Sequence, residues 1–123
     1  MSITLQNNAR NAAATAVGTL LNGGKLVFLT SGDAVVAELE FAGTAFGAPD
    51  EGVITANAIM ADDDTSAGTV ARYEARTSAD ALVLGGTVTT VGNGGDVELT
   101  SLTFAEGETL EITGYTLTMP ATA

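Results

Sequence analysis

Short apolar segments separated by turn residues fill the chain from Lys25 onward. Within these segments apolar residues tend to occupy every second position, which is the pattern of a strand with one buried face. The intervening clusters of Gly, Asp, Asn and Ser are typical of turns. We expect about seven strands between residues 25 and 119. Their regular spacing predicts a mainly β domain, either a β-sandwich or a jelly-roll-like barrel.

The same alternation predicts which side chains face the core. It is clearest in residues 35–41, where Val35 is expected to lie inward and Val36 outward, while residues 25–30 are apolar on both faces. The Gly-Asn-Gly-Gly run at residues 92–95 has the composition of a β-hairpin turn. The other residues predicted to face the core are Ala37, Leu39, Phe41, Ile54, Ala56, Ala58, Met60, Ala71, Tyr73, Ala75, Leu82, Leu84, Val88, Val97, Leu99, Leu102, Phe104, Leu110, Ile112, Tyr115, Leu117 and Met119.

The segment before the strands has helical spacing instead. Its apolar residues, many of them Ala, recur at every third or fourth position and predict a helix over residues 8–21. Asn7 or Asn8 is expected to cap its start, and the Asn-Gly-Gly run at residues 22–24 is expected to end it. A helix that precedes all the strands does not fit a parallel βαβ sheet. We therefore interpret residues 1–123 as one domain.

The composition restricts the chemistry that the chain can perform. It contains no His, Cys or Trp, and 4 basic residues stand against 15 carboxylates, giving a formal net charge of −11. Enzymes take most proton shuttles, nucleophiles and anion clamps from these missing or scarce types. We therefore predict a non-enzymatic protein with no catalytic residue, cofactor or metal site. The charge argues against nucleic acid and anionic membranes as partners and favours a partner with a basic patch.

Three acidic groups are candidate sites. Asp62–Asp64 could ligate Ca²⁺, but the run lacks the alternating spacing and the distal Glu of a calcium loop, so a solvated loop tip is favoured. Glu38 with Glu40, or Glu106 with Glu108, could supply the acid and base of a glycosidase. Few aromatic and basic residues accompany these pairs. A solubilising role that blocks aggregation is the favoured interpretation.

Two further motifs also have structural alternatives. The glycine-rich residues 85–95 lack the helix and the Lys that follow a phosphate-binding loop, so they are interpreted as turn glycines. Arg72 and Arg76 flank Glu74 on one face of a predicted strand and form the one cationic patch of an acidic sequence. A surface charge ladder with acids on neighbouring strands is favoured. A contact patch for an acidic partner is the alternative.

Several segments carry a resemblance to a known family. They are residues 20–26 (LLNGGKL), Leu39 with residues 46–49 (FGAP) and Gly52, residues 68–73 (GTVARY), residues 85–88 (GGTV), and residues 104–108 (FAEGE) through 118–120 (TMP). Together they resemble a family of small virion proteins of tailed bacteriophages and prophages. The pattern covers most of the chain, and its motifs are turn glycines and strand apolar residues.

The resemblance implies a capsid decoration, or cement, protein. Such a protein is made in the host cytoplasm and lies on the outer capsid surface of the virion, where it bridges subunits of the major capsid protein. A homo-oligomer on the capsid, such as a trimer, is compatible with this role. The expected contact elements are the N-terminal residues, the loop around Phe46 and the Ala-rich helix of residues 8–21.

Two other classes of function stay open at this point. One is another virion β-module, such as a tail-tube, fibre-base or carbohydrate-binding domain. A sugar-binding domain would present exposed aromatic rings, whereas Tyr73 and Tyr115 are predicted to face inward. The other is a small hydrolase that uses two carboxylates, for which the supporting residue types are scarce.

Overall fold

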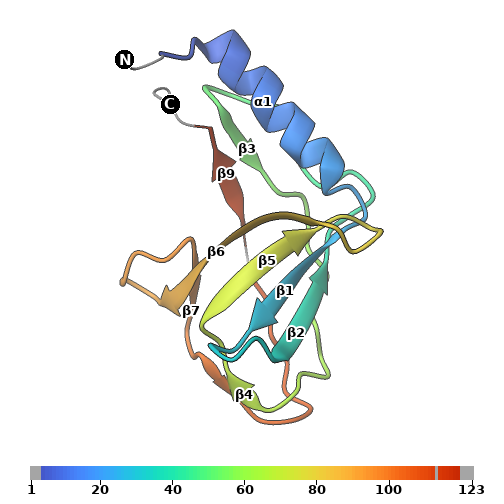
Figure 1. The fold of residues 1–123 in the computed structure, drawn as a ribbon, viewed down its shortest axis with the longest axis vertical. Coiled ribbons are helices and arrows are strands. Elements are labelled where there is room, and N and C mark those ends of the chain that lie inside the picture. The colour runs from blue at the N-terminus through green and yellow to red at the C-terminus, as the bar shows by residue number, and fades with distance from the viewer. Residues whose placement is uncertain (1–3, 113, 120–123) are drawn as a thin grey trace.

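The computed structural model describes residues 4–112 and 114–119 and shows a mainly β domain with one N-terminal helix, as the sequence predicts (Figure 1). The elements in chain order are α1 (Asn7–Leu20), β1 (Lys25–Leu29), β2 (Val35–Glu40), β3 (Val53–Thr55), β4 (Gly68–Thr69), β5 (Arg72–Arg76), β6 (Leu82–Thr90), β7 (Val97–Leu99), β8 (Thr103–Phe104) and β9 (Thr116–Thr118). The described residues form nine strands because two predicted strands divide, one into β4 and β5 and the other into β7 and β8.

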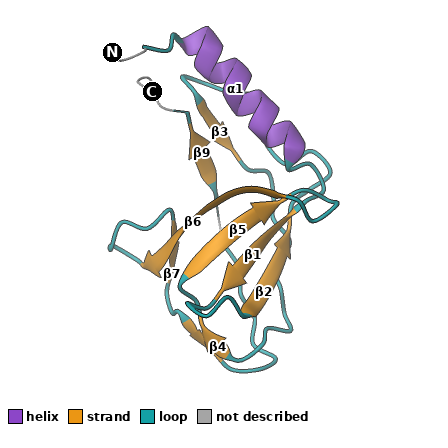
Figure 2. Ribbon diagram, viewed as in Figure 1, coloured by secondary structure: helices purple, strands orange, loops and turns teal. Residues whose placement is uncertain are grey.

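One sheet dominates the fold. Its five strands lie in the order β2-β1-β5-β6-β7, and the remaining strands form two small ribbons, β3–β9 and β4–β8. The long strand β6 curves across the sheet (Figure 2). Helix α1 lies along the β3–β9 ribbon at one end of the molecule, and β4 lies at the other end (Figure 1). The five-stranded sheet therefore lies between two different ends of the molecule, one formed by α1 with the β3–β9 ribbon and the other containing β4.

Helix α1 begins and ends one residue earlier than the predicted span of residues 8–21, and its start is capped differently. Gly23 adopts the left-handed conformation, with φ of 66°, that commonly ends a helix. At the start, Gln6 occupies the N-cap position and makes no side-chain cap bond. The prediction of an Asn at the N-cap position is wrong, because both asparagines lie inside the first turn. The Asn7 side chain accepts a bond from the Arg10 guanidinium at 3.2 Å, and the Asn8 side chain accepts the N–H of Ala9 at 2.9 Å.

The core joins side chains of the sheet to residues from α1, the Phe46 loop, β3 and the C-terminal segment, among them Ala14, Phe46, Ile54 and Tyr115. Strand β1 is buried on both faces, as predicted, with Leu26 and Phe28 pointing into the core. Beyond the sheet, the hydroxyl groups of Tyr73 and Tyr115 share a hydrogen bond of 2.8 Å. Both tyrosines are buried, and burial raises the pKa of each phenol above its ordinary value of 10. This bond ties the C-terminal segment to the central strand β5.

The predicted inward position of Val35 is wrong. Val35 is 44% exposed and Val36 is buried. The pairing of β1 with β2 shifts between Phe28 and Leu29, so that Val36 is an extra residue in the ladder. A bulge of this kind reverses the alternation beyond it.

Other predicted core positions are also wrong. Strand β3 ends at Thr55, and Met60 is 67% exposed because the chain leaves β3 to form a single bridge beside Glu40. Three more residues that were predicted to face the core are exposed. Ala58 lies in the loop after β3, Ala71 precedes β5, and Leu82 is the first residue of β6.

The glycine-rich run at residues 92–95 does not form an antiparallel hairpin. Strands β6 and β7 are parallel, with Val88 opposite Val97. The Glu98 carboxylate accepts bonds from the backbone N–H groups of Gly92 and Gly94, at 3.0 and 3.1 Å. Both glycines have positive φ, a backbone conformation that glycine adopts without strain. This conformation allows the loop to reverse direction and bring β7 beside the last residues of β6.

Candidate functional site

Two of the three expected contact elements meet in space. Gly18 of α1 lies against Phe46 and Ile54, and a Cβ atom at this position would stand 3.1 Å from the Ile54 side chain and 3.3 Å from the Phe46 ring. The absence of a side chain therefore allows the helix to approach the Phe46 loop closely. The sequence identified both elements but gave no indication that they are neighbours.

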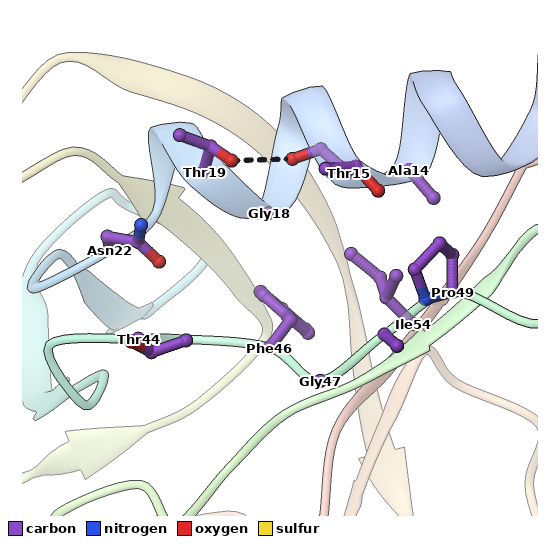
Figure 3. Close-up of a pocket in the computed structure, with 11 residues that line it drawn as sticks. Ala14, Thr15, Gly18, Thr19, Asn22, Thr44, Phe46, Gly47, Pro49 and Ile54 are labelled. Carbon is purple, nitrogen blue, oxygen red and sulfur yellow. Dashed lines mark hydrogen bonds between the residues drawn. The ribbon is translucent and has the colours of Figure 1, made fainter.

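A shallow groove of about 240 Å³ lies between them (Figure 3). Phe46, Pro49 and Ile54 point from the loop and β3 toward the helix (Figure 3). Thr15 and Thr19 are exposed on the helix, and the Thr19 hydroxyl donates to the Thr15 carbonyl at 2.8 Å. The groove is lined by Ala14, Thr15, Gly18, Thr19, Asn22, Thr44, Phe46, Gly47, Ala48, Pro49 and Ile54, all of them uncharged.

Hydrogen bonds hold the loop in place. The Asn22 side chain accepts a bond from the backbone N–H of Ala45 at 2.9 Å. The N–H of Gly47 donates to the carbonyl of Thr55 at 3.0 Å. The Phe46 ring also packs against other rings of the core, 5.5 Å from Phe41 between centroids. A groove held in this way needs little ordering when a partner binds.

The helix is fixed to the β3–β9 ribbon at its other end. The Arg10 guanidinium donates to the carbonyl of Met119 at 3.0 Å, and the Asn11 side chain accepts from the N–H of Gly52 at 2.8 Å. Of the expected N-terminal contact residues, 1–3 lie outside the described residues, and Thr4 is exposed. Helix, ribbon and loop are therefore joined by polar contacts around the groove.

The second candidate site is the cationic patch on β5. Arg72 contacts Asp33 at 2.5 Å and Glu74 at 2.8 Å, and Arg76 contacts Glu74 at 2.5 Å and Asp80 at 3.1 Å. Each guanidinium thus lies between two carboxylates. This geometry is a charge ladder, as favoured, but the acids that contact the two arginines do not lie on neighbouring strands. Glu74 belongs to β5 itself, and Asp33 and Asp80 lie in the connections after β1 and β5.

The ladder includes one residue that the sequence analysis missed. Lys25 of β1 lies opposite Arg76 and contacts Asp80 at 3.2 Å and Glu38 at 3.9 Å. The strand register that makes Lys25 a neighbour of β5 cannot be read from the sequence. Beneath these side chains lies Val27, which is fully buried although it faces away from the core. The aliphatic stems of charged residues commonly cover apolar surface in this way.

Glu74 is the centre of the ladder. Its side chain is only 16% exposed, and hydrogen bonds from Arg72 and then Arg76 hold its pKa below the ordinary value of 4.5. A carboxylate with a lowered pKa contributes stability above its unfolded-state pKa, and this stability is lost as the pH falls through the folded-state value. The ladder should therefore weaken below pH 4.5.

Glu74→Gln is expected to reduce the free energy of unfolding by about 1 kcal/mol at neutral pH, because the two guanidiniums lose a shared charged acceptor while solvent screens part of the effect. The loss should shrink as the pH falls from 4.5 through the lowered folded-state pKa, where the wild-type carboxylate becomes protonated in the folded protein too. Urea denaturation at several pH values measures both effects. Glu40→Gln, an equal charge change at an exposed position of β2, is the control. Equal losses for the two variants would contradict a specific role for Glu74.

The acidic candidates have structural partners in this fold. The Asp62 carboxylate accepts bonds from the N–H groups of Glu38 and Asp64, each at 2.9 Å. The Glu108 carboxylate accepts from the N–H of Ala105 at 3.1 Å. No group of three or more potential metal ligands lies together among the described residues. Asp62 therefore serves to join its loop to β2.

Comparison with known proteins does not extend this picture. No protein-family model, curated protein or solved structure matches the chain. In the described part of the chain, no helix has the length and apolar character needed to cross a membrane. The function is therefore proposed from the resemblance that the sequence carries and from the geometry of the candidate site.

Proposed function

We propose that this chain is a structural capsid decoration protein of a tailed phage. It would bind the outer capsid surface and bridge neighbouring subunits of the major capsid protein, with no catalytic step. The observation that carries the proposal is the groove between α1 and the Phe46 loop. Two elements expected to make contacts converge there on one preformed surface.

The groove has the properties of a protein contact. Its floor is apolar and includes Phe46 and Ile54, while Thr15 and Thr19 supply a polar rim. Interfaces between proteins commonly combine an apolar centre with such a rim. The six aromatic residues of the chain all lie within the described residues, and each is buried or half-buried. This favours protein contact over the stacking of a sugar on an exposed ring.

The charge distribution suits a particle surface. Three of the four cations, Lys25, Arg72 and Arg76, are paired within the charge ladder. Most of the 15 carboxylates lie outside the ladder and give the rest of the surface a strong negative charge. A coat of such molecules would repel neighbouring virions. Each capsid contact needs only modest affinity, because many linked contacts add up on one particle.

The proposal is tested on virions of the phage that carries this gene. Mass spectrometry should find the protein in hundreds of copies per particle, as multivalent coating requires. Deletion of the gene should remove all copies and lower the temperature at which heads release DNA. A few copies per virion, or heads with unchanged heat resistance, would contradict the proposal and favour a tail or fibre role.

Thr15→Glu tests the groove directly. The added negative charge would be buried when this rim position contacts the capsid. It should therefore weaken binding to heads that lack the protein by about tenfold, or 1.4 kcal/mol. Co-sedimentation of the purified variant with these heads measures the affinity. Ala12→Glu is the matched control, since Ala12 is exposed on the same helix but does not line the groove. Equal binding by both variants would show that the groove is not the contact surface.

A further inference from the structure

The two edges of the five-stranded sheet differ. At the β2 edge, Glu40 and Met60 exchange two backbone hydrogen bonds, of 3.3 and 2.9 Å. Farther along, the N–H of Ser66 donates to the carbonyl of Val36 at 2.8 Å. The Asp62 carboxylate accepts the N–H of Glu38, which lies between these two points. The chain therefore closes this edge with its own polar groups.

The opposite edge is formed by β7, and within residues 4–112 and 114–119 no strand pairs with its outer side. The N–H of Val91 donates to the carbonyl of Leu99 at 3.1 Å. Together with the strand register, this bond identifies which residues of β7 direct their backbone groups toward β6. In a parallel pair only alternate residues bond to the neighbouring strand. The backbone groups of Val97 and Leu99 therefore face β6, and those of Glu98 face away. Within the described residues, no backbone group bonds to the N–H or carbonyl of Glu98.

Two adjoining hollows lie beside this edge. One has a volume of about 470 Å³ and the other about 370 Å³, and Glu98 and Ile112 line both. The larger hollow has apolar walls that include Leu99, Phe104 and Leu110. Val91, which also lines it, is 64% exposed. Together the hollows form a trough that follows the outer edge of β7.

The charged residues described in the lining of the trough are all acidic. Asp96, Glu98, Glu108 and Glu111 line its two hollows, and none of the described residues lining them is Lys or Arg. The carboxylates of Glu98 and Glu108 accept backbone bonds but keep their negative charge. An edge strand whose Glu98 backbone has no partner among the described residues, beside apolar pockets and acidic walls, fits an extended peptide that carries basic side chains.

We propose that the β7 edge accepts an extended, basic segment of a partner protein as an additional strand of the sheet. The backbone of the segment would pair with the N–H and carbonyl of Glu98. Side chains of the segment would alternate in direction, so that its apolar side chains pack against the apolar walls and its basic side chains pair with the carboxylates. The inference depends on the proposed function only for the owner of the segment, which would be the capsid protein.

The binding chemistry can be tested without a capsid. The probe is the peptide acetyl-Lys-Val-Lys-Val-Lys-Val-amide, and its counterpart with Glu in place of Lys is the control. Titration followed by nuclear magnetic resonance should show saturable shifts centred on Glu98, with slower hydrogen exchange of its amide, for the basic peptide only. Equal binding of the acidic peptide, or shifts spread over all acidic surfaces, would overturn the inference.

Val91→Lys tests the trough itself. The added cation should weaken binding of the basic peptide by about fivefold through like-charge repulsion. Leu82→Lys is the control, since Leu82 is 62% exposed, at the other end of β6, and the charge change is the same. Equal losses for the two variants would overturn the inference, because they would reflect net charge alone.

Capsid binding separates this inference from the proposed function. If the protein coats heads but the Glu98 amide is not protected and Val91→Lys coats equally well, the β7 inference is wrong while the decoration role stands. If the basic peptide binds at β7 but the protein does not coat heads, the decoration role is wrong and the strand-addition site stands.

Discussion

Gly24→Ala is expected to lower the free energy of unfolding by at least about 3 kcal/mol, and the variant is expected to fold poorly. Gly24 joins α1 to β1, where the chain passes close to the end of β5. An added Cβ would stand 2.2 Å from the carbonyl oxygen of Arg76 and 3.0 Å from that of Leu21. Both oxygens belong to the backbone, so a rotamer change cannot relieve the overlap.

The clash would also disturb the hydrogen bonds around this junction. The N–H of Gly24 donates to Leu21 at 2.8 Å, and its carbonyl accepts from Phe41 at 2.9 Å. Gly43→Ala is the control, since an added Cβ there meets no atom within 4 Å and φ is not positive. It should change stability by less than about 1 kcal/mol. Thermal and urea denaturation of both variants measure the difference, and similar midpoints would show that the junction can relax.

Local structure was largely predictable from the sequence. The helix and its glycine stop follow from spacing and from the left-handed preference of Gly23. The burial of β1 on both faces follows from its unbroken apolar run, and Tyr73 and Tyr115 face inward as expected. Each of these features depends on neighbours in the sequence.

Strand pairing was not predictable in the same way. The bulge that exposes Val35 arises from the register between two strands, which no local pattern encodes. The run at residues 92–95 has the composition of a hairpin, but the Glu98 carboxylate binds its amides and β7 pairs in parallel. In both places a contact between strands overrides the local preference.

The same limit applies to the candidate site. The sequence indicated the helix and the Phe46 loop as contact elements, but only the fold brings Gly18 against Phe46. The charge ladder was expected from the alternation of Arg72, Glu74 and Arg76. Its extension to Lys25 depends on the pairing of β1 with β5. Residue type indicates what a side chain can do, and long-range pairing decides what it contacts.

Phe28→Ala should cost about 3–5 kcal/mol of unfolding free energy, the range for large-to-small changes in a packed core. Phe28 is fully buried on β1, which lies between β2 and β5, and its ring centre is 6.2 Å from that of Tyr73. Truncation leaves a cavity that this sheet cannot easily close, because the strands on both sides of β1 are hydrogen-bonded to it.

Phe104→Ala makes the same truncation at a half-buried position in the short strand β8. It should cost less than half as much, because less apolar area is removed from the core and solvent can fill the space. Urea denaturation of both variants tests the comparison. Equal losses would mean that the β4–β8 end is as tightly packed as the centre of the sheet. A larger loss for Phe28→Ala would show that the centre of the sheet, at β1 and β5, contributes more to stability than the β4–β8 end. The same core includes Phe46 and Ile54 from the groove and Leu99 from β7, so changes to the contact surfaces must be made at exposed positions such as Thr15 and Val91 if the protein is to stay folded.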